Sequence, residues 1–261
     1  MASDTSHTAD TIALAKKESA EHMEGLADVF QTMRQKPLII RAHPLDASVS
    51  GPNVKTVHFV RHGQGFHNLL ADMAKADGKV WENFVDTPDN PYMRPELLDS
   101  PLTHKGRQQA LASAMTNPPE LVVVSPACRA LATGVLVFAG APNILAHELV
   151  REGTGIHACD QRRPTSQQAR EFPQVDFSML TEEDELFDPH RRETKPEVAE
   201  RIYQFLEWLS QRSEREVGVA SHSEWLLTVF NGVCECNDES LKAWFQTGEL
   251  RSVQLEFVTK A

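Results

Sequence analysis

Three short runs of apolar and β-branched residues constrain the fold of this chain more than any other feature. They lie at residues 56–60 (TVHFV), 121–124 (LVVV) and 216–220 (EVGVA), and each is followed by a stretch with helical spacing. Strands that alternate with helices favour an α/β architecture with a largely parallel sheet. We therefore predict a three-layer α/β sandwich, in which helices cover both faces of a mostly parallel central sheet.

The N-terminal part of the chain has a different pattern. Apolar residues recur with helical spacing over residues 8–34, and Pro37, Pro44, Gly51 and Pro52 then mark a turn-rich segment. We interpret residues 1–53 as a partly helical N-terminal extension that packs on the main domain or stays partly mobile. Residues 54–261 would form the main domain.

The remaining helices and strands are predicted from the spacing of apolar residues and from residues that cap helices or form turns. Residues 63–77 are predicted to form a helix with Leu69, Leu70 and Met73 on one face. Thr103 is placed to cap the next helix. A further amphipathic helix is predicted over residues 195–212, with its inward face formed by Val198, Ile202, Phe205, Leu206 and Leu209. Residues 253–258 alternate in polarity and predict a last strand, at an edge of the sheet. Residues 78–101 and 147–193 are predicted to be irregular.

Charge and composition exclude several classes of function. The formal net charge is −11, which argues against broad binding to nucleic acid, because such binding needs a basic face. No apolar run reaches the roughly 18 residues that a membrane span needs, and the N-terminus has neither a secretory signal nor a clear transit peptide. Four cysteines in 261 residues are typical of a reducing compartment, so we expect a cytoplasmic protein. Cys234 and Cys236 could be half a metal site, but no second pair accompanies them, which favours incidental thiols.

Polar side chains follow each of the three predicted strands. The first strand ends at Arg61 and His62, the second leads through Ser125 to Arg129, and the third leads to His222. Ligands of such sheets bind beyond the carboxyl ends of the strands. Neighbouring strands would bring two arginines and two histidines together there, beside the free N–H groups of helix N-termini. This is a predicted anion site, and guanidinium groups match phosphate oxygens in a bidentate way.

Four segments then match a known pattern in order. RHGQGFHN (61–68) resembles the Arg-His-Gly-Glu/Gln-x-x-x-Asn signature of the histidine phosphatase superfamily, the phosphoglycerate-mutase-like proteins. LTHKGRQQA (102–110), SPACRALAT (125–133) and VASHSEWL (219–226) resemble its later elements, so the resemblance covers roughly residues 55–258. The segment ELVREGTGIHACDQRRP and the RRE at 191–193 are similar to a plant and protist group of phosphoglycerate-mutase-like proteins.

The resemblance implies a role for each matched position. His62 would be the nucleophile that forms a phosphohistidine, and Arg61 and Arg129 would clamp the transferring phosphoryl group. His222 would be a second clamp in its protonated form. Three further residues would contact the phosphate or let the backbone approach it closely: Gly63, Asn68 and Ser223. His67 is predicted to serve in packing.

The proton donor to the leaving group is the least constrained position. The family takes it from a glutamate or aspartate in the segment after the second strand–helix unit, where Glu148 and Glu152 both stand. Glu152 is favoured because a glycine follows it closely, and Asp160 is a third choice. Arg162 and Arg163 are predicted to reach the substrate beyond its phosphate, with a surface pair as the alternative.

These roles predict a phosphomonoester hydrolase that acts on a small phosphorylated metabolite through a phosphohistidine. The alternatives are a phosphomutase of the phosphoglycerate mutase type, in which a second hydroxyl takes the phosphoryl group, or a non-catalytic phosphate-binding module. The chemistry requires no metal and no cofactor. The predicted partner is the small phosphorylated substrate alone, with neither nucleic acid nor membrane, and the sequence does not determine an oligomeric state.

Overall fold

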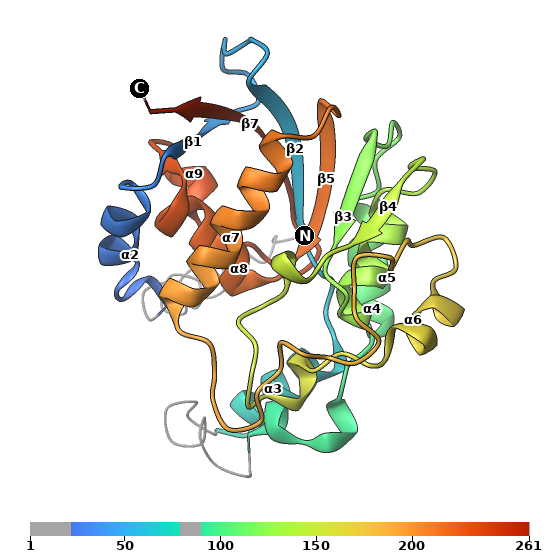
Figure 1. Cartoon of the computed structure of the whole chain (residues 1–261). Helices are drawn as coiled ribbons and strands as arrows, with labels where there is room; N and C mark the ends of the chain where they lie inside the picture. The colour runs from blue at the N-terminus through green and yellow to red at the C-terminus, as the bar shows by residue number, and fades with distance from the viewer. Residues whose placement is uncertain (1–21, 79–89, 261) are drawn as a thin grey trace, which may run out of the picture.

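The computed structural model describes residues 22–78 and 90–260, and within these ranges one mixed sheet organises the fold (Figure 1). Its strand order is β4-β3-β5-β2-β7-β1-β6. The strands are β1 (Leu38–Pro44), β2 (Val54–Arg61), β3 (Leu121–Val124), β4 (Ile144–Ala146), β5 (Glu216–Ser221), β6 (Glu235–Cys236) and β7 (Leu250–Thr259). The three strands predicted from the sequence, β2, β3 and β5, are parallel neighbours at its centre.

The sheet confirms the predicted fold class and corrects two details. Four of its six strand pairings are parallel, and the two antiparallel ones both involve β7. β7 therefore lies between β2 and β1, so the prediction of an edge strand was wrong. Residues 38–44, predicted to be turn-rich, form β1 along β7. The domain boundary at residue 53 stays a prediction.

Helices cover both faces of the sheet. α2 (Leu26–Met33), α7 (Lys195–Ser210) and α8 (Ser223–Thr228) pack on one face, and α4 (His104–Ala112) and α5 (Cys128–Val137) on the other (Figure 1). Val57 and Phe59 of β2 point into the first layer and Val60 into the second, as strand alternation requires. Each such side chain is fully buried, which stabilises the fold by about 1.5–3 kcal/mol.

Two helix predictions were right in their details. The inward face predicted for α7 is buried at all five positions. α7 starts with a capping box, in which Thr194 and Glu197 satisfy each other's backbone N–H groups. The Thr103 side chain caps α4 by accepting a hydrogen bond from the Gly106 N–H at 3.0 Å. The part of the predicted first helix at residues 8–21 lies outside the described residues.

The helix after β2 turns a different face inward from the one predicted. α3 (Phe66–Ala76) begins at Gly65, whose N–H donates to the Asn68 side chain at 3.0 Å. Its buried residues are His67 and Ala71, whereas Met73 is 54% exposed. On the predicted apolar face, Leu69 and Leu70 are half-buried, so the most buried face is the one that carries His67 and Ala71. His67 and Ala71 are four residues apart and share one face of a helix.

The segments predicted to be irregular contain short helices, one of which, η2 (Pro91–Met93), packs against α3. The segment after residue 89 contains η2 and η3 (Pro95–Leu97), and residues 79–89 are outside the described part of the chain. After β4 come η4 (Glu148–Val150), η5 (Ala158–Asp160) and α6 (Thr165–Glu171). β6 is preceded by the π-helical turn η6 (Val229–Val233) and followed by α9 (Glu239–Lys242). None of the helices described has the length and apolar character needed to cross a membrane.

Candidate active site

His62 stands immediately after β2 and is 2% exposed. Its backbone N–H donates to the carbonyl of Ser221 in β5 at 3.0 Å, so the sheet hydrogen bonding extends to this residue. Its Nδ1 lies 2.7 Å from the carbonyl oxygen of Gly63. Because a carbonyl only accepts, Nδ1 carries the proton and Nε2 keeps the lone pair. Burial and the charge of Arg129 hold the pKa of His62 well below 6.5, so the ring is a neutral nucleophile near pH 7.

His222 follows β5 and lies against His62, with ring centroids 4.9 Å apart. Its Nε2 is 2.8 Å from the hydroxyl oxygen of Ser125, the first residue after β3. Burial and Arg129 hold the pKa of His222 well below 6.5, which differs from the predicted protonated state. A phosphate dianion against this ring would supply the opposite charge that favours protonation.

Arg129 reaches the site from the first turn of α5 and is 1% exposed. It donates to the Cys159 carbonyl at 2.5 Å and to the Asp160 carboxylate at 2.8 Å. Its Nε is buried and has no hydrogen-bond partner among the described residues. Burial alone would raise the pKa of Asp160, but His157, whose Nδ1 lies 3.7 Å from the carboxylate, and the charges of Arg192 and Arg129 lower it well below 3.8. Asp160 is therefore an anion that orients Arg129, so the structure does not favour it as the acid.

Arg61, the last residue of β2, is held by the segment between α9 and β7. It donates to the carbonyl of Phe245 at 2.7 Å, and its guanidinium carbon lies 5.5 Å from the ring centroid of Trp244. Its charge contributes to the lowered pKa of His62. The structure thus brings together all four groups that the strand ends predicted.

Gly63 has a different purpose from the one predicted. A side chain at Gly63 would place its Cβ 2.2 Å from the Gly106 carbonyl oxygen, and one at Gly106 would lie 2.2 Å from that of Gln64. The Gly63 N–H donates to the Thr133 hydroxyl at 3.0 Å, and the Gln64 N–H to the Gln109 side chain at 2.8 Å. The glycine therefore lets α4 approach the loop after β2, and its N–H is already used within the protein. Gly106 and Gln109 belong to the LTHKGRQQA segment and Thr133 to the SPACRALAT segment, so these two segments fix the loop after β2.

Asn68 and His67 connect α3 to the site. The Asn68 side chain accepts from the Gly65 N–H and hydrogen-bonds Tyr92. The ring of His67 lies 5.7 Å from that of His62 and 5.4 Å from that of Tyr92. Burial and Arg129 hold the pKa of His67 well below 6.5. His67 was predicted to serve in packing, and the structure also places its ring beside that of His62. Its position inside the RHGQGFHN segment was a signal for this place.

Glu152 lies beside the start of α8, the helix that directly follows His222. Its carboxylate accepts from the Trp225 N–H at 3.0 Å, the Glu224 N–H at 3.2 Å and the Ser223 hydroxyl at 3.2 Å. Burial, Glu224 and Asp160 raise the pKa of this partly buried carboxyl above 4.5. Ser223 thus contacts Glu152 through its side chain.

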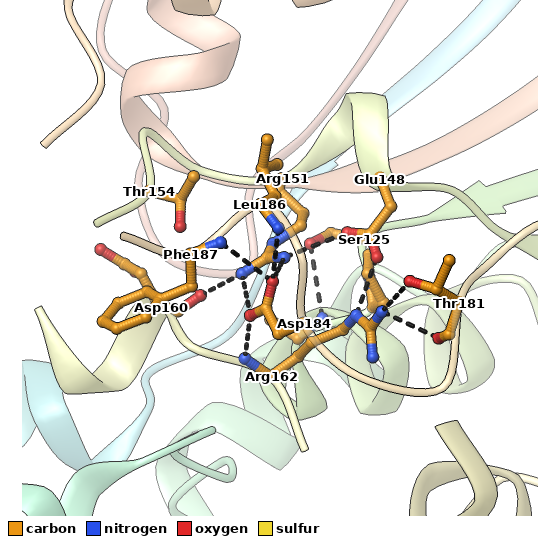
Figure 2. Close-up of polar contacts among 12 residues, drawn as sticks. Ser125, Glu148, Arg151, Thr154, Asp160, Arg162, Thr181, Asp184, Leu186 and Phe187 are labelled. Atoms are coloured by element: carbon orange, nitrogen blue, oxygen red, sulfur yellow. Dashed lines mark hydrogen bonds and ion pairs between the residues drawn. The ribbon is translucent and has the colours of Figure 1, made fainter. Parts of the chain in front are cut away.

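Glu148 is held elsewhere, in a cluster of buried ion pairs (Figure 2). Its carboxylate binds Arg151 at 3.1 Å and Arg162 at 2.8 Å. Asp184 binds Arg151 through both carboxylate oxygens, at 2.6 and 2.8 Å, and accepts from the Arg162 N–H at 2.9 Å. These residues join the segment after β4 to the turn at Asp184.

Arg162 and Arg163, predicted to reach the substrate or to form a surface pair, both have partners within the protein. The Arg162 side chain is 0% exposed and donates to Glu148 and to the carbonyls of Thr181, Glu182 and Glu183 (Figure 2). Arg163 pairs with the carboxylates of Asp99 and Glu171 at 2.9 and 2.8 Å, and its side chain is 29% exposed. Both guanidinium groups hold loops together, and neither is directed by these contacts toward His62.

Comparison with known proteins identifies the class of this molecule. The model of the histidine phosphatase superfamily (branch 1) matches residues 94–257, a range that includes Arg129 and His222. A phosphoglycerate mutase-like protein of Arabidopsis thaliana is 32% identical over 241 residues, covering 76% of this chain and 83% of the relative. The chain therefore belongs to the histidine phosphatase superfamily.

Two further comparisons add detail. The phosphoglycerate mutase-like protein 1 of Arabidopsis thaliana is 33% identical over 240 residues, covering 76% of this chain and 80% of the relative. Among solved structures, a putative alpha-ribazole-5'-P phosphatase from Escherichia coli is 16% identical with a TM-score of 0.49, covering 79% of this chain and 97% of that one. The resemblance read from the sequence, including its plant phosphoglycerate-mutase-like group, is confirmed by the relatives.

Proposed function

We propose that this protein is a phosphomonoester hydrolase that acts on a small phosphorylated metabolite through a phosphohistidine at His62. The observation that carries the proposal is the state of His62. Its Nδ1 is bound by the Gly63 carbonyl, its pKa is low, and Arg129 and His222 lie against it. A neutral, oriented imidazole beside fixed positive charge is what an attack on a phosphate ester requires.

The first step transfers the phosphoryl group to the enzyme. The lone pair on Nε2 of His62 forms the N–P bond while the P–O bond to the leaving group breaks. Arg129 and Arg61 stabilise the charge on the transferring oxygens. The leaving oxygen takes a proton, and Glu152 supplies it, because its raised pKa keeps a larger fraction of the carboxyl protonated.

The environments of the two glutamates support Glu152 over Glu148. Two arginines bind the Glu148 carboxylate, so this group is engaged in ion pairs within the protein. Glu152 faces the carboxylates of Glu224 and Asp160, and it lies next to the residue that follows His222.

The second step returns the enzyme to its starting state. Water attacks the phosphorus, the N–P bond breaks, and its electron pair returns to Nε2 of His62. The Glu152 carboxylate left by the first step takes the proton of this water, so inorganic phosphate and the protonated acid are regenerated.

A phosphomutase is the second candidate, and the names of the Arabidopsis relatives favour it. In a mutase the same phosphohistidine would pass its phosphoryl group to a second hydroxyl of the bound substrate. The guanidinium of Arg162 is bound within the protein, so we do not assign it to the rest of such a substrate.

Hydrolysis of two phosphate esters in EDTA tests the proposal. His62→Ala should lose at least about 10⁴-fold in kcat/KM on p-nitrophenyl phosphate. Glu152→Gln should lose about 10²–10⁴-fold on an alkyl phosphate, and much less on p-nitrophenyl phosphate, whose leaving group needs little help from an acid. His104→Ala, an exposed histidine at the start of α4, is the matched control and should match wild type.

Trapping the intermediate separates the alternatives. A hydrolase should give an acid-labile ³²P label on wild type that is absent from His62→Ala and decays at the rate of turnover. A label that decays slowly in water but transfers to an added phosphate-bearing alcohol would indicate the mutase. Phosphate binding without any label would indicate the binding module and overturn the proposal.

A further inference from the structure

A short segment between the turn at Asp184 and α7 packs against the loop that carries Glu152. We call residues 188–193 the strap and residues 152–156 the acid loop. The Ile156 N–H donates to the Asp188 carbonyl at 2.9 Å, and the Glu193 N–H to the Thr154 carbonyl at 2.8 Å. The Thr154 N–H in turn donates to the Glu193 carboxylate at 2.9 Å. The strap therefore has a fixed register against the acid loop.

Two glycines of the acid loop make room for this contact. A side chain at Gly155 would place its Cβ 2.0 Å from the carbonyl oxygen of Arg191, and Gly155 also has a φ of 99°. A Cβ at Gly153 would lie 2.8 Å from a carboxylate oxygen of Glu224 and 3.6 Å from Nη2 of Arg192. The acid loop is thus shaped to receive the backbone of the strap and one of its two arginines.

Arg192 is the residue that the strap delivers to the site. Its Nη1 lies 3.0 Å from the Asp160 carboxylate and 3.2 Å from the Gly155 carbonyl, and its Nη2 lies 3.6 Å from the Glu224 carboxylate. The other oxygen of the Asp160 carboxylate binds Arg129. The N–H of Glu224 binds Glu152. One guanidinium therefore connects the partner of the proposed phosphate clamp to the neighbour of the proposed acid.

We propose that Arg192 is a positioning residue of this active site, which holds the carboxylates of Asp160 and Glu224 and so sets the charge around Glu152. The inference rests on the proposed function of Glu152 as the acid and base. Arg192 matches the RRE segment that the sequence analysis singled out without assigning it a role. It acts through other residues and need not touch the substrate.

The charges around Glu152 come from several elements. Glu224 and Asp160 raise the pKa of Glu152, and Arg192 lowers it. From α7, Arg201 donates to the Glu152 carbonyl at 2.9 Å, and its charge is paired with Glu193 at 2.7 Å. Arg151 precedes Glu152 in the chain, and its charge is paired with Asp184 at 2.6 Å. His222 precedes Ser223, which contacts Glu152, and is neutral near pH 7 because its pKa is low. Without Arg192 the Glu224 carboxylate would lose this ion pair and Asp160 one of its two arginines.

The direct test is the titration of Glu152 in the intact protein. Protein labelled with [δ-¹³C]glutamate is titrated by NMR, and the Glu152 signal is assigned by its absence from Glu152→Gln. Arg192→Gln should raise the pKa of Glu152 by about one unit or more. Arg192→Lys keeps the charge and should return most of that shift. Arg191→Gln is the matched control, because the guanidinium of Arg191, the residue before Arg192, is exposed and pairs with Glu197 on the surface.

The same variants give an independent kinetic readout. With an alkyl phosphate, the basic limb of the kcat/KM profile should move to higher pH in Arg192→Gln and stay in place in Arg191→Gln, since Glu152 must be protonated to act as acid. An unchanged Glu152 pKa in a folded Arg192→Gln protein would overturn this inference and leave the proposed function intact. A shifted pKa in a protein that forms no phosphoenzyme would support the electrostatic role and overturn the proposed function.

Discussion

The two sides of the candidate site are held in place by different interactions. His62, Ser125 and His222 follow neighbouring parallel strands, and hydrogen bonds of the sheet continue up to His62. The side that carries Glu152 and Asp160 belongs to the long segment between β4 and α7, which has little regular structure. Apolar burial holds the first side, whereas the second is held by arginines paired with carboxylates.

The difference lies in which forces locate each group. On the first side, the strands are buried on both faces, and each large side chain in the core stabilises the fold by about 1.5–3 kcal/mol. The ends of these strands are therefore rigid. In the loop side, Arg151, Arg162 and Arg201 are buried, and each binds carboxylates and backbone carbonyls. Such pairs gain little net stability but cost several kcal/mol when one partner is lost, so they specify one arrangement of the loops.

The largest expected effect comes from breaking the loop side at Asp184. Asp184→Ala leaves Arg151 without its bidentate partner in a site where both side chains are almost fully buried. We expect the free energy of unfolding to fall by about 3–5 kcal/mol, measured by urea denaturation. Glu185→Ala, an exposed carboxylate in the same turn, is the control and should change it by about 0.5 kcal/mol or less. A loss below about 1 kcal/mol for Asp184→Ala would show that the loop side is not held by this cluster.

An intermediate effect is expected from pH on the sheet side. His62, His67 and His222 all have pKa values well below 6.5 in the folded chain. As pH falls below 6.5, these three rings take up protons in the unfolded chain but stay neutral in the folded one. The free energy of unfolding should therefore fall by about 1.4 kcal/mol per pH unit for each ring until the pH reaches its folded pKa.

A difference measurement isolates this contribution from other titrating groups. Urea denaturation of wild type and His222→Asn between pH 7.5 and 5.5 should give slopes that differ by up to about 1.4 kcal/mol per pH unit. Equal slopes would mean that folding does not lower the pKa of His222, and the description of the sheet side as a neutral, buried histidine pair would fail.

The smallest expected effect, at Arg163, sharpens the comparison within the loop side itself when it is set against Arg162. Arg163 is partly exposed, so Arg163→Gln should cost about 1 kcal/mol or less. The adjacent Arg162 is fully buried, and Arg162→Gln should cost about 3 kcal/mol or more. Chemical denaturation of the two variants under the same conditions provides the measurement. Equal losses would show that burial does not separate these two neighbouring residues.

Much of the sheet side could be predicted from the sequence. The runs before Arg61, Ser125 and Ser221 have the composition of buried strands, and the polar groups that follow them are adjacent in the chain. Parallel neighbours place their carboxyl ends at one edge, so the convergence of Arg61, His62, Arg129 and His222 follows from local patterns. The same patterns missed β1, because its neighbouring prolines indicated turns. They also predicted β7 at an edge of the sheet, where β1 in fact pairs with it.

The loop side was decided by the tertiary structure. Glu148 and Glu152 are alike in sequence context, and only their partners distinguish them: arginines for the first, N–H groups and carboxylates for the second. Arg162 and Arg163 are adjacent and identical, yet burial separates them. The sequence alone determined which chemical groups stand at the strand ends, because strand and helix periodicity are local properties. The fold decided which charges meet, because ion pairs join residues from distant segments, and no spacing rule encodes such pairs.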